Sequence, residues 1–150
     1  MDKVYKKLIS KVDPKHIIFI GISAGGGFAL GFAQKLKYDG LPQPAQIILD
    51  SPWLDITCNN SEMRDLEKYD TVLDVDLLKI AGKYYTKGGD TDSYMVCPVN
   101  GPIENLGKIS VFVGTYDILW ADVKKLKSRC DEKGVAINLY VYPLDVSEFT

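Results

Sequence analysis

The chain has 150 residues, of which 46% are hydrophobic and 25% are charged, and 18 Lys and Arg against 20 Asp and Glu give a net charge of −2. These values are typical of a globular protein and exclude a disordered or collagen-like chain. The length predicts a single domain, spanning 1–150, that buries a core of its own. The nearly balanced charge gives no electrostatic signal for binding nucleic acid or an anionic membrane.

The three cysteines, Cys58, Cys97 and Cys130, are widely spaced and odd in number. Their spacing matches no zinc-binding pattern, and His16 is the only histidine in the chain,. We therefore expect reduced thiols in a cytoplasmic protein, with no metal and no cofactor.

Hydrophobic periodicity predicts strands and helices in alternation. The predicted elements, in chain order, are a helix at 2–12, a strand at 16–22, a helix at 24–37, a strand at 46–49, a helix at 75–85, a strand at 109–113, a helix at 119–133 and a strand at 136–142. Long helices between strands are crossover connections, so the fold class is α/β, with a parallel sheet of four strands and helices on both faces. Residues 54–105 are predicted to be a polar excursion that contains one helix, and its first part, 54–72, is expected to be a loop or excursion on the surface.

The segment 17–33 carries no charge and follows several lysines, so it has some features of a short membrane span or a signal peptide,. Five glycines interrupt it, and its β-rich first part changes abruptly into a turn of small residues. We therefore expect no membrane span here. The continuous apolar run at 17–22 is instead typical of a strand buried on both faces.

Residues 21–25, Gly-Ile-Ser-Ala-Gly, form a G-x-S-x-G pattern between a predicted strand and a predicted helix,. In that context Ser23 lies at a tight, strained turn, and Gly21 and Gly25 allow the neighbouring backbone to approach. The following helix directs its first N–H groups and its positive dipole end at the same place, so the Ala24 N–H would be an oxyanion donor. The alternative is a glycine-rich turn of a nucleotide-binding fold, although no matching phosphate-binding motif follows.

Asp117 comes at the end of the third predicted strand, at the sheet edge where catalytic groups gather in open parallel sheets. It would orient a histidine and stabilise its protonated form, or alternatively cap the next helix. Its position downstream of Ser23 favours the catalytic interpretation. Asp122 competes with Asp117 for this role but is expected on the solvated face of a helix. Asp50 and Asp55 either shape the site or hydrogen-bond within their own loop.

A serine nucleophile needs a general base, and the order Ser, Asp, His requires a histidine after Asp117. The sequence has none there. His16 is at the start of the first predicted strand, about 20 Å from the hydroxyl of Ser23 if that strand is extended. We therefore expect no catalytic role for His16.

Four segments together resemble the hormone-sensitive-lipase-like esterases and lipases of the α/β-hydrolase superfamily. They are GISAGGG at 21–27, SPWLD at 51–55, GTYDILWAD at 114–122 and KGVAINLYVYP at 133–143. The resemblance implies a serine carboxylesterase or lipase that hydrolyses small carboxylic esters. It also implies that Ser23 is the nucleophile, Asp117 the triad acid and the Ala24 backbone N–H an oxyanion donor.

The sequence departs from that family at both ends, since it has neither the upstream HGGG-type segment nor the histidine that follows the last strand. It resembles the C-terminal half of such an enzyme, and we expect the isolated chain to be inactive or very weak. Without further strands, 17–22 is an exposed apolar edge that would pair with a second copy or with a missing N-terminal half. A non-catalytic interaction module that uses this edge, or a peptidase or thioesterase, remains an alternative.

Overall fold

Four parallel strands form one sheet in the computed structural model, which describes residues 1–143. Their spatial order follows the chain: β1 (Ile18–Ile22), β2 (Gln46–Asp50), β3 (Lys108–Gly114) and β4 (Ile137–Tyr142). The predicted parallel sheet of four strands is confirmed, with each strand close to its predicted bounds. All four carboxyl ends therefore meet at one edge of the sheet.

The described part of the chain also contains five α-helices and two short 3₁₀ helices. They are α1 (Asp2–Ile9), η1 (Pro14–His16), α2 (Ala24–Tyr38), α3 (Glu62–Leu66), α4 (Val75–Thr86), η2 (Pro98–Asn100) and α5 (Trp120–Glu132). The first helix was predicted to continue to residue 12 but ends at Ile9. The chain then turns into η1, where the Asp13 carboxylate accepts a hydrogen bond from the Lys15 N–H at 2.9 Å.

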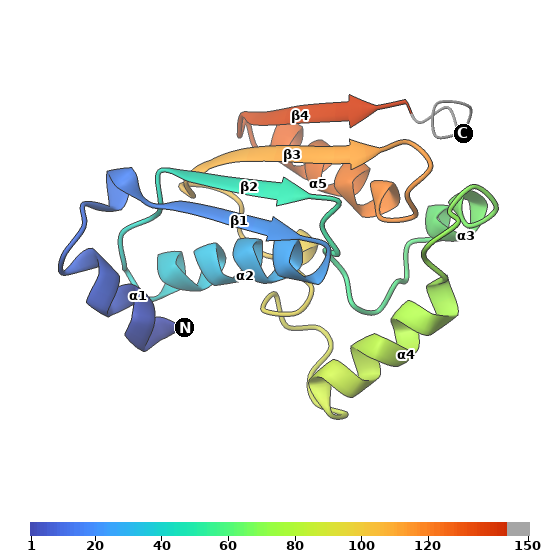
Figure 1. Cartoon of the computed structure of the whole chain (residues 1–150), viewed down its shortest axis with the longest axis horizontal. Helices are drawn as coiled ribbons and strands as arrows, with labels where there is room; N and C mark the ends of the chain where they lie inside the picture. Colours follow the sequence, from blue (N-terminus) through green and yellow to red (C-terminus); the bar gives the residue numbers. More distant parts are fainter. Residues whose placement is uncertain (144–150) are drawn as a thin grey trace.

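The helices α1, α2 and α5 all pack against the same face of the sheet (Figure 1). Helices were predicted on both faces, and among residues 1–143 that prediction is wrong. Parallel crossovers are right-handed, so a strand order that advances in one direction keeps every crossover on one side. The main core lies on this face, between the inward side chains of the strands, such as Leu49 and Val111, and those of α2 and α5, such as Leu30 and Leu126.

The opposite face is covered by no described helix. We call the apolar side chains that it presents the uncovered face: Ile18, Ile20, Ile22, Ile48, Phe112, Tyr140 and Tyr142. The strand β1 was expected to be buried on both faces, yet its three isoleucines are 51%, 69% and 65% exposed in chain order. As expected, β1 is the edge strand of the described sheet.

The segment 54–105 is not a surface excursion. It contributes buried side chains to a second core, which lies under α4 and the start of α5, and it contains α3 as well as the predicted helix. The members of this core are Trp53, Ile56, Cys58, Met63, Val75, Cys97, Ile118, Leu119 and Ala121. The segment is therefore an integral layer over the carboxyl edge of the sheet.

The uncharged run at 17–33 folds as β1 and the first part of α2. Within residues 1–143, no helix combines the length and the apolar character that crossing a bilayer requires. The cysteines at 58, 97 and 130 are buried and unbridged.

Candidate active site

The turn between β1 and α2 holds Ser23 in an unusual backbone conformation, with φ 52° and ψ −119°. Hydrogen bonds fix this turn on two sides. The Ser23 N–H donates to the Asp50 carbonyl at 2.9 Å, and the Ser23 carbonyl accepts from the Trp53 N–H at 2.9 Å. A positive φ at a non-glycine residue persists only where the surroundings impose it, and such strain is concentrated at functional sites.

Close packing around this turn depends on Gly21 and Gly26, and on Gly27, where a Cβ would lie 2.1 Å from the Trp53 carbonyl oxygen. A Cβ on Gly21 would lie 2.2 Å from the Gly25 carbonyl oxygen, and a Cβ on Gly26 would lie 2.7 Å from the Cβ of Pro52. A Cβ on Gly25 would meet nothing within 4 Å. The prediction that glycine is needed for close backbone approach is therefore correct for Gly21 and wrong for Gly25. At the start of α2 the close contact, with Pro52, is at Gly26 instead.

Ser23 and Asp117 line the same cavity, of about 520 Å³, at the carboxyl edge of the sheet. The other lining residues are Ser51, Tyr69, Asp70, Thr71, Val72, Leu73, Tyr116 and Leu119. This volume lies within the range of pockets that hold small ligands. Ser23 and Asp117, the two residues predicted to be catalytic, thus reach the same cavity from the ends of two different strands.

The Asp117 carboxylate is partly buried and accepts a hydrogen bond from the Leu119 N–H at 2.8 Å. It therefore caps the following turn, as the alternative interpretation expected, while it also lines the cavity. Burial raises the pKa of Asp117, and the nearby carboxylates of Asp70 and Asp50 raise it further. The nearby Ser51 side chain and the hydrogen bond from the Leu119 N–H act in the opposite direction.

Sequence reasoning missed Tyr69 and Asp70, which bring a loop of the 54–105 segment over the cavity. The Asp70 carboxylate accepts hydrogen bonds from the N–H groups of Val72 and Leu73, both at 2.9 Å, and of Ile118 at 3.0 Å. The Tyr69 ring stacks on the Tyr116 ring with centroids 5.1 Å apart. An Asp at a turn can be recognised from the local sequence, but the hydrogen bond of Asp70 with the Ile118 N–H, 48 residues away, cannot,.

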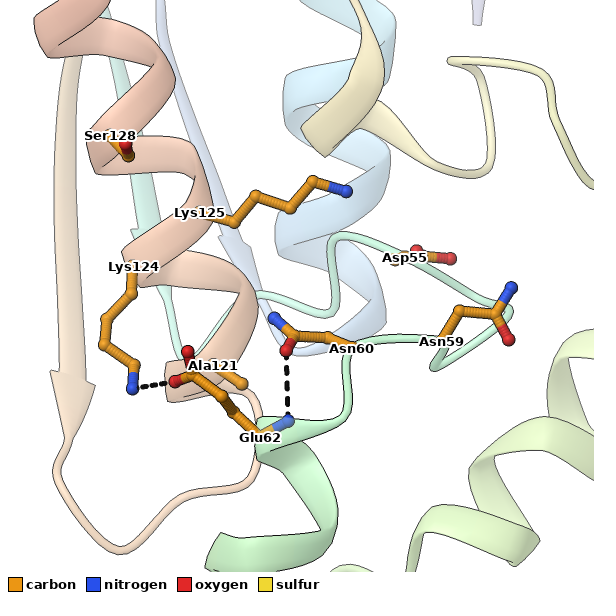
Figure 2. A pocket seen from close by; sticks show the side chains of 8 residues that line it. All are labelled: Asp55, Asn59, Asn60, Glu62, Ala121, Lys124, Lys125 and Ser128. Atoms are coloured by element: carbon orange, nitrogen blue, oxygen red, sulfur yellow. Dashed lines mark hydrogen bonds and ion pairs between the residues drawn. The ribbon is translucent and has the colours of Figure 1, made fainter.

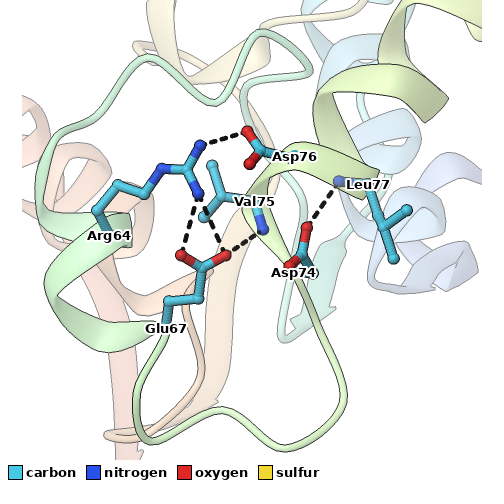
Figure 3. Close-up of polar contacts among 6 residues, drawn as sticks. All are labelled: Arg64, Glu67, Asp74, Val75, Asp76 and Leu77. Atoms are coloured by element: carbon cyan, nitrogen blue, oxygen red, sulfur yellow. Dashed lines mark hydrogen bonds and ion pairs between the residues drawn. The ribbon is translucent and has the colours of Figure 1, made fainter.

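The base of this loop is closed by the polar contacts in Figure 3. The Glu67 carboxylate accepts a hydrogen bond from the Val75 N–H at 2.8 Å, which joins the two ends of the loop. Arg64 pairs with Glu67 at 3.1 Å and also with Asp76. These exposed ion pairs add little stability by themselves, so their main effect is to fix where the loop begins and ends.

Ala24 is exposed at the first position of α2, and its N–H donates to no acceptor among the described residues. It also borders a narrow apolar crevice of about 40 Å³, lined by Phe28, Trp53 and Met95 among others. A free N–H at a helix start is the kind of group that binds an oxyanion. The oxyanion role of Ala24 stays a prediction.

His16 lies in η1, which precedes β1 and so occupies the amino edge of the sheet. Ser23 follows β1 at the other edge. The structure thus separates the only histidine of the chain from the cavity, as expected from the sequence.

A comparison with protein families matches residues 3–150 with a family described as alpha/beta hydrolase fold. The chain belongs to this family. Curated relatives of this chain include an esterase of Acinetobacter venetianus, 29% identical over 136 residues, and an acetyl-hydrolase of Streptomyces hygroscopicus, 26% identical over 140 residues. These alignments cover 90% and 93% of the chain but 45% and 47% of the relatives, so the chain spans about half of their length.

Solved structures give the same result. An esterase from the bacterial hormone-sensitive lipase family superimposes with a TM-score of 0.88 at 26% identity, covering 93% of this chain and 47% of that one. The esterase EstE5, soaked with p-nitrophenyl butyrate, gives 0.86 at 28% identity with the same coverage. The resemblance to hormone-sensitive-lipase-like esterases and the partial α/β-hydrolase fold are confirmed.

Asp55 faces a second cavity, of about 480 Å³, together with Asn60, Lys124 and Lys125 (Figure 2). Neither Ser23 nor Asp117 lines that cavity. The Asp55 carboxylate accepts hydrogen bonds from the Thr57 N–H at 2.8 Å and from the Cys97 thiol at 3.1 Å. The expectation that Asp55 bonds within its own loop is met, together with a second contact that the sequence did not indicate.

Asp122 is fully buried, so its expected place on a solvated helix face is wrong. The Asn60 amide donates to one of its oxygens at 3.0 Å, while the other oxygen has no described partner. Burial raises the pKa of Asp122 to about 6. The reason for the error is the second core, since the 54–105 segment covers the face of α5 that would otherwise be solvated.

Replacing Asp122 by asparagine should remove part of the pH dependence of stability. The raised pKa means that the folded chain binds this proton more tightly than the unfolded chain. The wild-type free energy of unfolding should therefore fall as the pH rises from about 4 to about 6, by at most about 3 kcal/mol from this group. Urea unfolding of Asp122→Asn across this range should show a smaller fall, whereas Asp65→Asn, on the exposed side of α3, should follow the wild type. An unchanged fall in Asp122→Asn would contradict this.

Proposed function

We propose that the chain carries the nucleophile and the acid of a serine carboxylesterase or lipase. The observation that carries this proposal is that Ser23, on its strained turn, lines one cavity with Asp117. The relatives named esterase and acetyl-hydrolase support the ester-hydrolysing class. A cavity of about 520 Å³ suits a small carboxylic ester,.

In this proposal the Ser23 hydroxyl attacks the acyl carbon of the ester. The Ala24 N–H donates to the oxyanion that forms, assisted by the positive dipole end of α2. Asp117 orients a histidine and stabilises its protonated form. That histidine comes from outside this sequence, because His16 lies at the opposite edge of the sheet.

The isolated chain should hydrolyse esters weakly or not at all. A triad without its base loses several orders of magnitude in rate, although the oxyanion donors and substrate binding leave some residual catalysis. The proposal thus concerns the chemistry that Ser23 and Asp117 are placed to perform when a base is supplied. A cytoplasmic location stays a prediction.

A second candidate function is that of an interaction module, and the uncovered face favours it. This face and the free edge of β1 expose Ile18, Ile20 and Ile22 side by side. We propose that they pair with a second copy of the chain or with a complementary N-terminal half. An exposed apolar edge strand is a template for such pairing.

A fluorophosphonate probe with added imidazole tests the catalytic proposal. Imidazole can enter the cavity as a substitute base, so phosphonylation should be faster with imidazole and should map to Ser23 by peptide mass spectrometry. Ser23→Ala should lose the adduct, whereas Ser61→Ala, at an exposed serine whose side chain makes no cap hydrogen bond, should keep it. An adduct on other serines only, or no effect of imidazole, would favour the interaction module.

A further inference from the structure

The charged side chains of the cavity that holds Ser23 are all acidic. They are Asp70 and Asp117, and none of the described residues that line this cavity is Lys, Arg or His. Three backbone N–H groups hold the Asp70 carboxylate in place, at 2.9 Å, 2.9 Å and 3.0 Å. Burial raises the pKa of Asp117, and the carboxylates of Asp70 and Asp50 raise it further. The electrostatic potential in this cavity is therefore negative.

Two basic residues, Arg64 and Lys68, lie near the start of the loop that covers the cavity, and other groups engage both of them. Arg64 pairs with Glu67 and Asp76, which balance its charge. The Lys68 ammonium lies 4.7 Å from the centroid of the Tyr69 ring, within the range of a cation–π contact,. An aromatic residue of the cavity thus already attracts a cation, and neither basic side chain lines the cavity.

The aromatic part of the lining is the pair Tyr69 and Tyr116. Their rings stack with centroids 5.1 Å apart and an angle of 18° between the ring planes, and both residues line the cavity. Tyr69 is 46% exposed, so part of its surface is open to a ligand. Val72 and Leu73 add apolar surface to the same cavity. Aromatic rings recognise quaternary ammonium ions in proteins, and nearby carboxylates attract their positive charge.

We propose that this cavity takes a carboxylic ester that carries a positively charged ammonium group, recognised by the Asp70 carboxylate and by the Tyr69–Tyr116 pair. The inference rests on the proposed function, because it takes this cavity as the substrate site. It narrows the substrate class from small carboxylic esters to cationic ones. The ester carbonyl would lie at Ser23 and the ammonium group at the loop above it. An ester that carries a carboxylate would be rejected, because its charge would lie next to charges of the same sign.

Equilibrium binding of choline to the 150-residue chain tests this inference. The uncharged ligand of the same shape, 3,3-dimethylbutan-1-ol, is the control, and NMR titration would follow the ring protons of Tyr69 and Tyr116. Choline should bind about tenfold more tightly than the alcohol, because only choline gains the cation–π and carboxylate interactions. Added NaCl should weaken the binding of choline more than the binding of the alcohol.

Substitutions in the lining separate the ring contact from the charge. Tyr69→Leu should weaken choline binding about tenfold, whereas Tyr69→Phe keeps the aromatic face and should retain most of the affinity. Tyr38→Leu, at an exposed tyrosine that does not line the cavity, should bind choline as the wild type does. Val72→Lys places a positive charge in the lining and should also weaken choline binding about tenfold. Val72→Gln adds similar length without the charge and should have little effect.

Equal affinities for choline and the alcohol would overturn the inference, as would equal losses of choline binding in Val72→Lys and Val72→Gln. Unchanged choline binding in Tyr69→Leu would also overturn it, because the cation would then bind elsewhere. The titrations need no turnover, so they separate this inference from the proposed function. A preference for choline without phosphonylation of Ser23 supports the cation site and contradicts the catalytic proposal, whereas labelled Ser23 without the preference contradicts this inference alone.

Discussion

Replacing Gly21 by alanine is expected to lower the free energy of unfolding by about 3 kcal/mol or more, as measured by urea denaturation. The added Cβ would lie 2.2 Å from the Gly25 carbonyl oxygen and 2.7 Å from the Gly26 nitrogen. Both contacts are with backbone atoms, so no side-chain rotation can relieve them. The start of α2 would have to move away from β1, and this movement would also release the strained turn at Ser23.

Gly25→Ala is the matched control, with the same added atom four residues along the same turn. Its Cβ would meet nothing within 4 Å, and alanine favours a helix by up to about 1 kcal/mol over glycine,. The variant should therefore be as stable as the wild type or slightly more stable. Equal destabilisation by the two substitutions would contradict the packing described at this turn.

Replacing Ile20 by lysine is expected to abolish self-association of the chain. Ile20 lies in the middle of β1, is 69% exposed and belongs to the uncovered face. Burying such a side chain in each of two copies contributes about 3 kcal/mol in total, so its loss should weaken the dimer by about 100-fold or more. A lysine on an edge strand also opposes pairing directly.

Analytical ultracentrifugation over a range of concentrations would measure this change. Leu77→Lys serves as the control, because Leu77 is similarly exposed, at 66%, but lies on α4 and away from the sheet. The wild type and Leu77→Lys should associate while Ile20→Lys sediments as a monomer. A monomeric wild type would contradict pairing with a second copy, and equal effects of both lysines would contradict pairing through β1.

The sheet was predictable because its strands are short apolar runs bounded by turn residues. The turn at 21–25 was also predictable, since G-x-S-x-G between a strand and a helix has few structural interpretations. That Ser23 and Asp117 meet in one cavity followed from their places after parallel strands,. Their catalytic roles stay predictions.

The errors arose where structure depends on long-range packing. The five residues of α3 are too few to show a helical period, so the 54–105 segment was expected to be a surface excursion,. The second core that this segment builds then buries Asp122. No local sequence pattern in 54–105 or in α5 indicates that these two segments pack together.

The distribution of helices could not be predicted for a different reason. Alternation of strands and helices predicts crossovers but not the direction in which each new strand is added. Here every strand adds on the same side, so α1, α2 and α5 share one face of the sheet. The contact of Asp70 with Ile118 was equally hidden, because it joins a loop to a turn that is distant in the chain.

The central claim is that Ser23 and Asp117 act on one reacting group in their shared cavity. The rate of imidazole-assisted phosphonylation of Ser23, compared between the wild type and Asp117→Asn, tests this claim most directly. Because Asp117 would orient and stabilise the imidazole cation, Asp117→Asn should reduce the imidazole-dependent part of the rate at least tenfold, or about 1.4 kcal/mol. Equal imidazole-dependent rates in the two proteins, both folded, would contradict the claim.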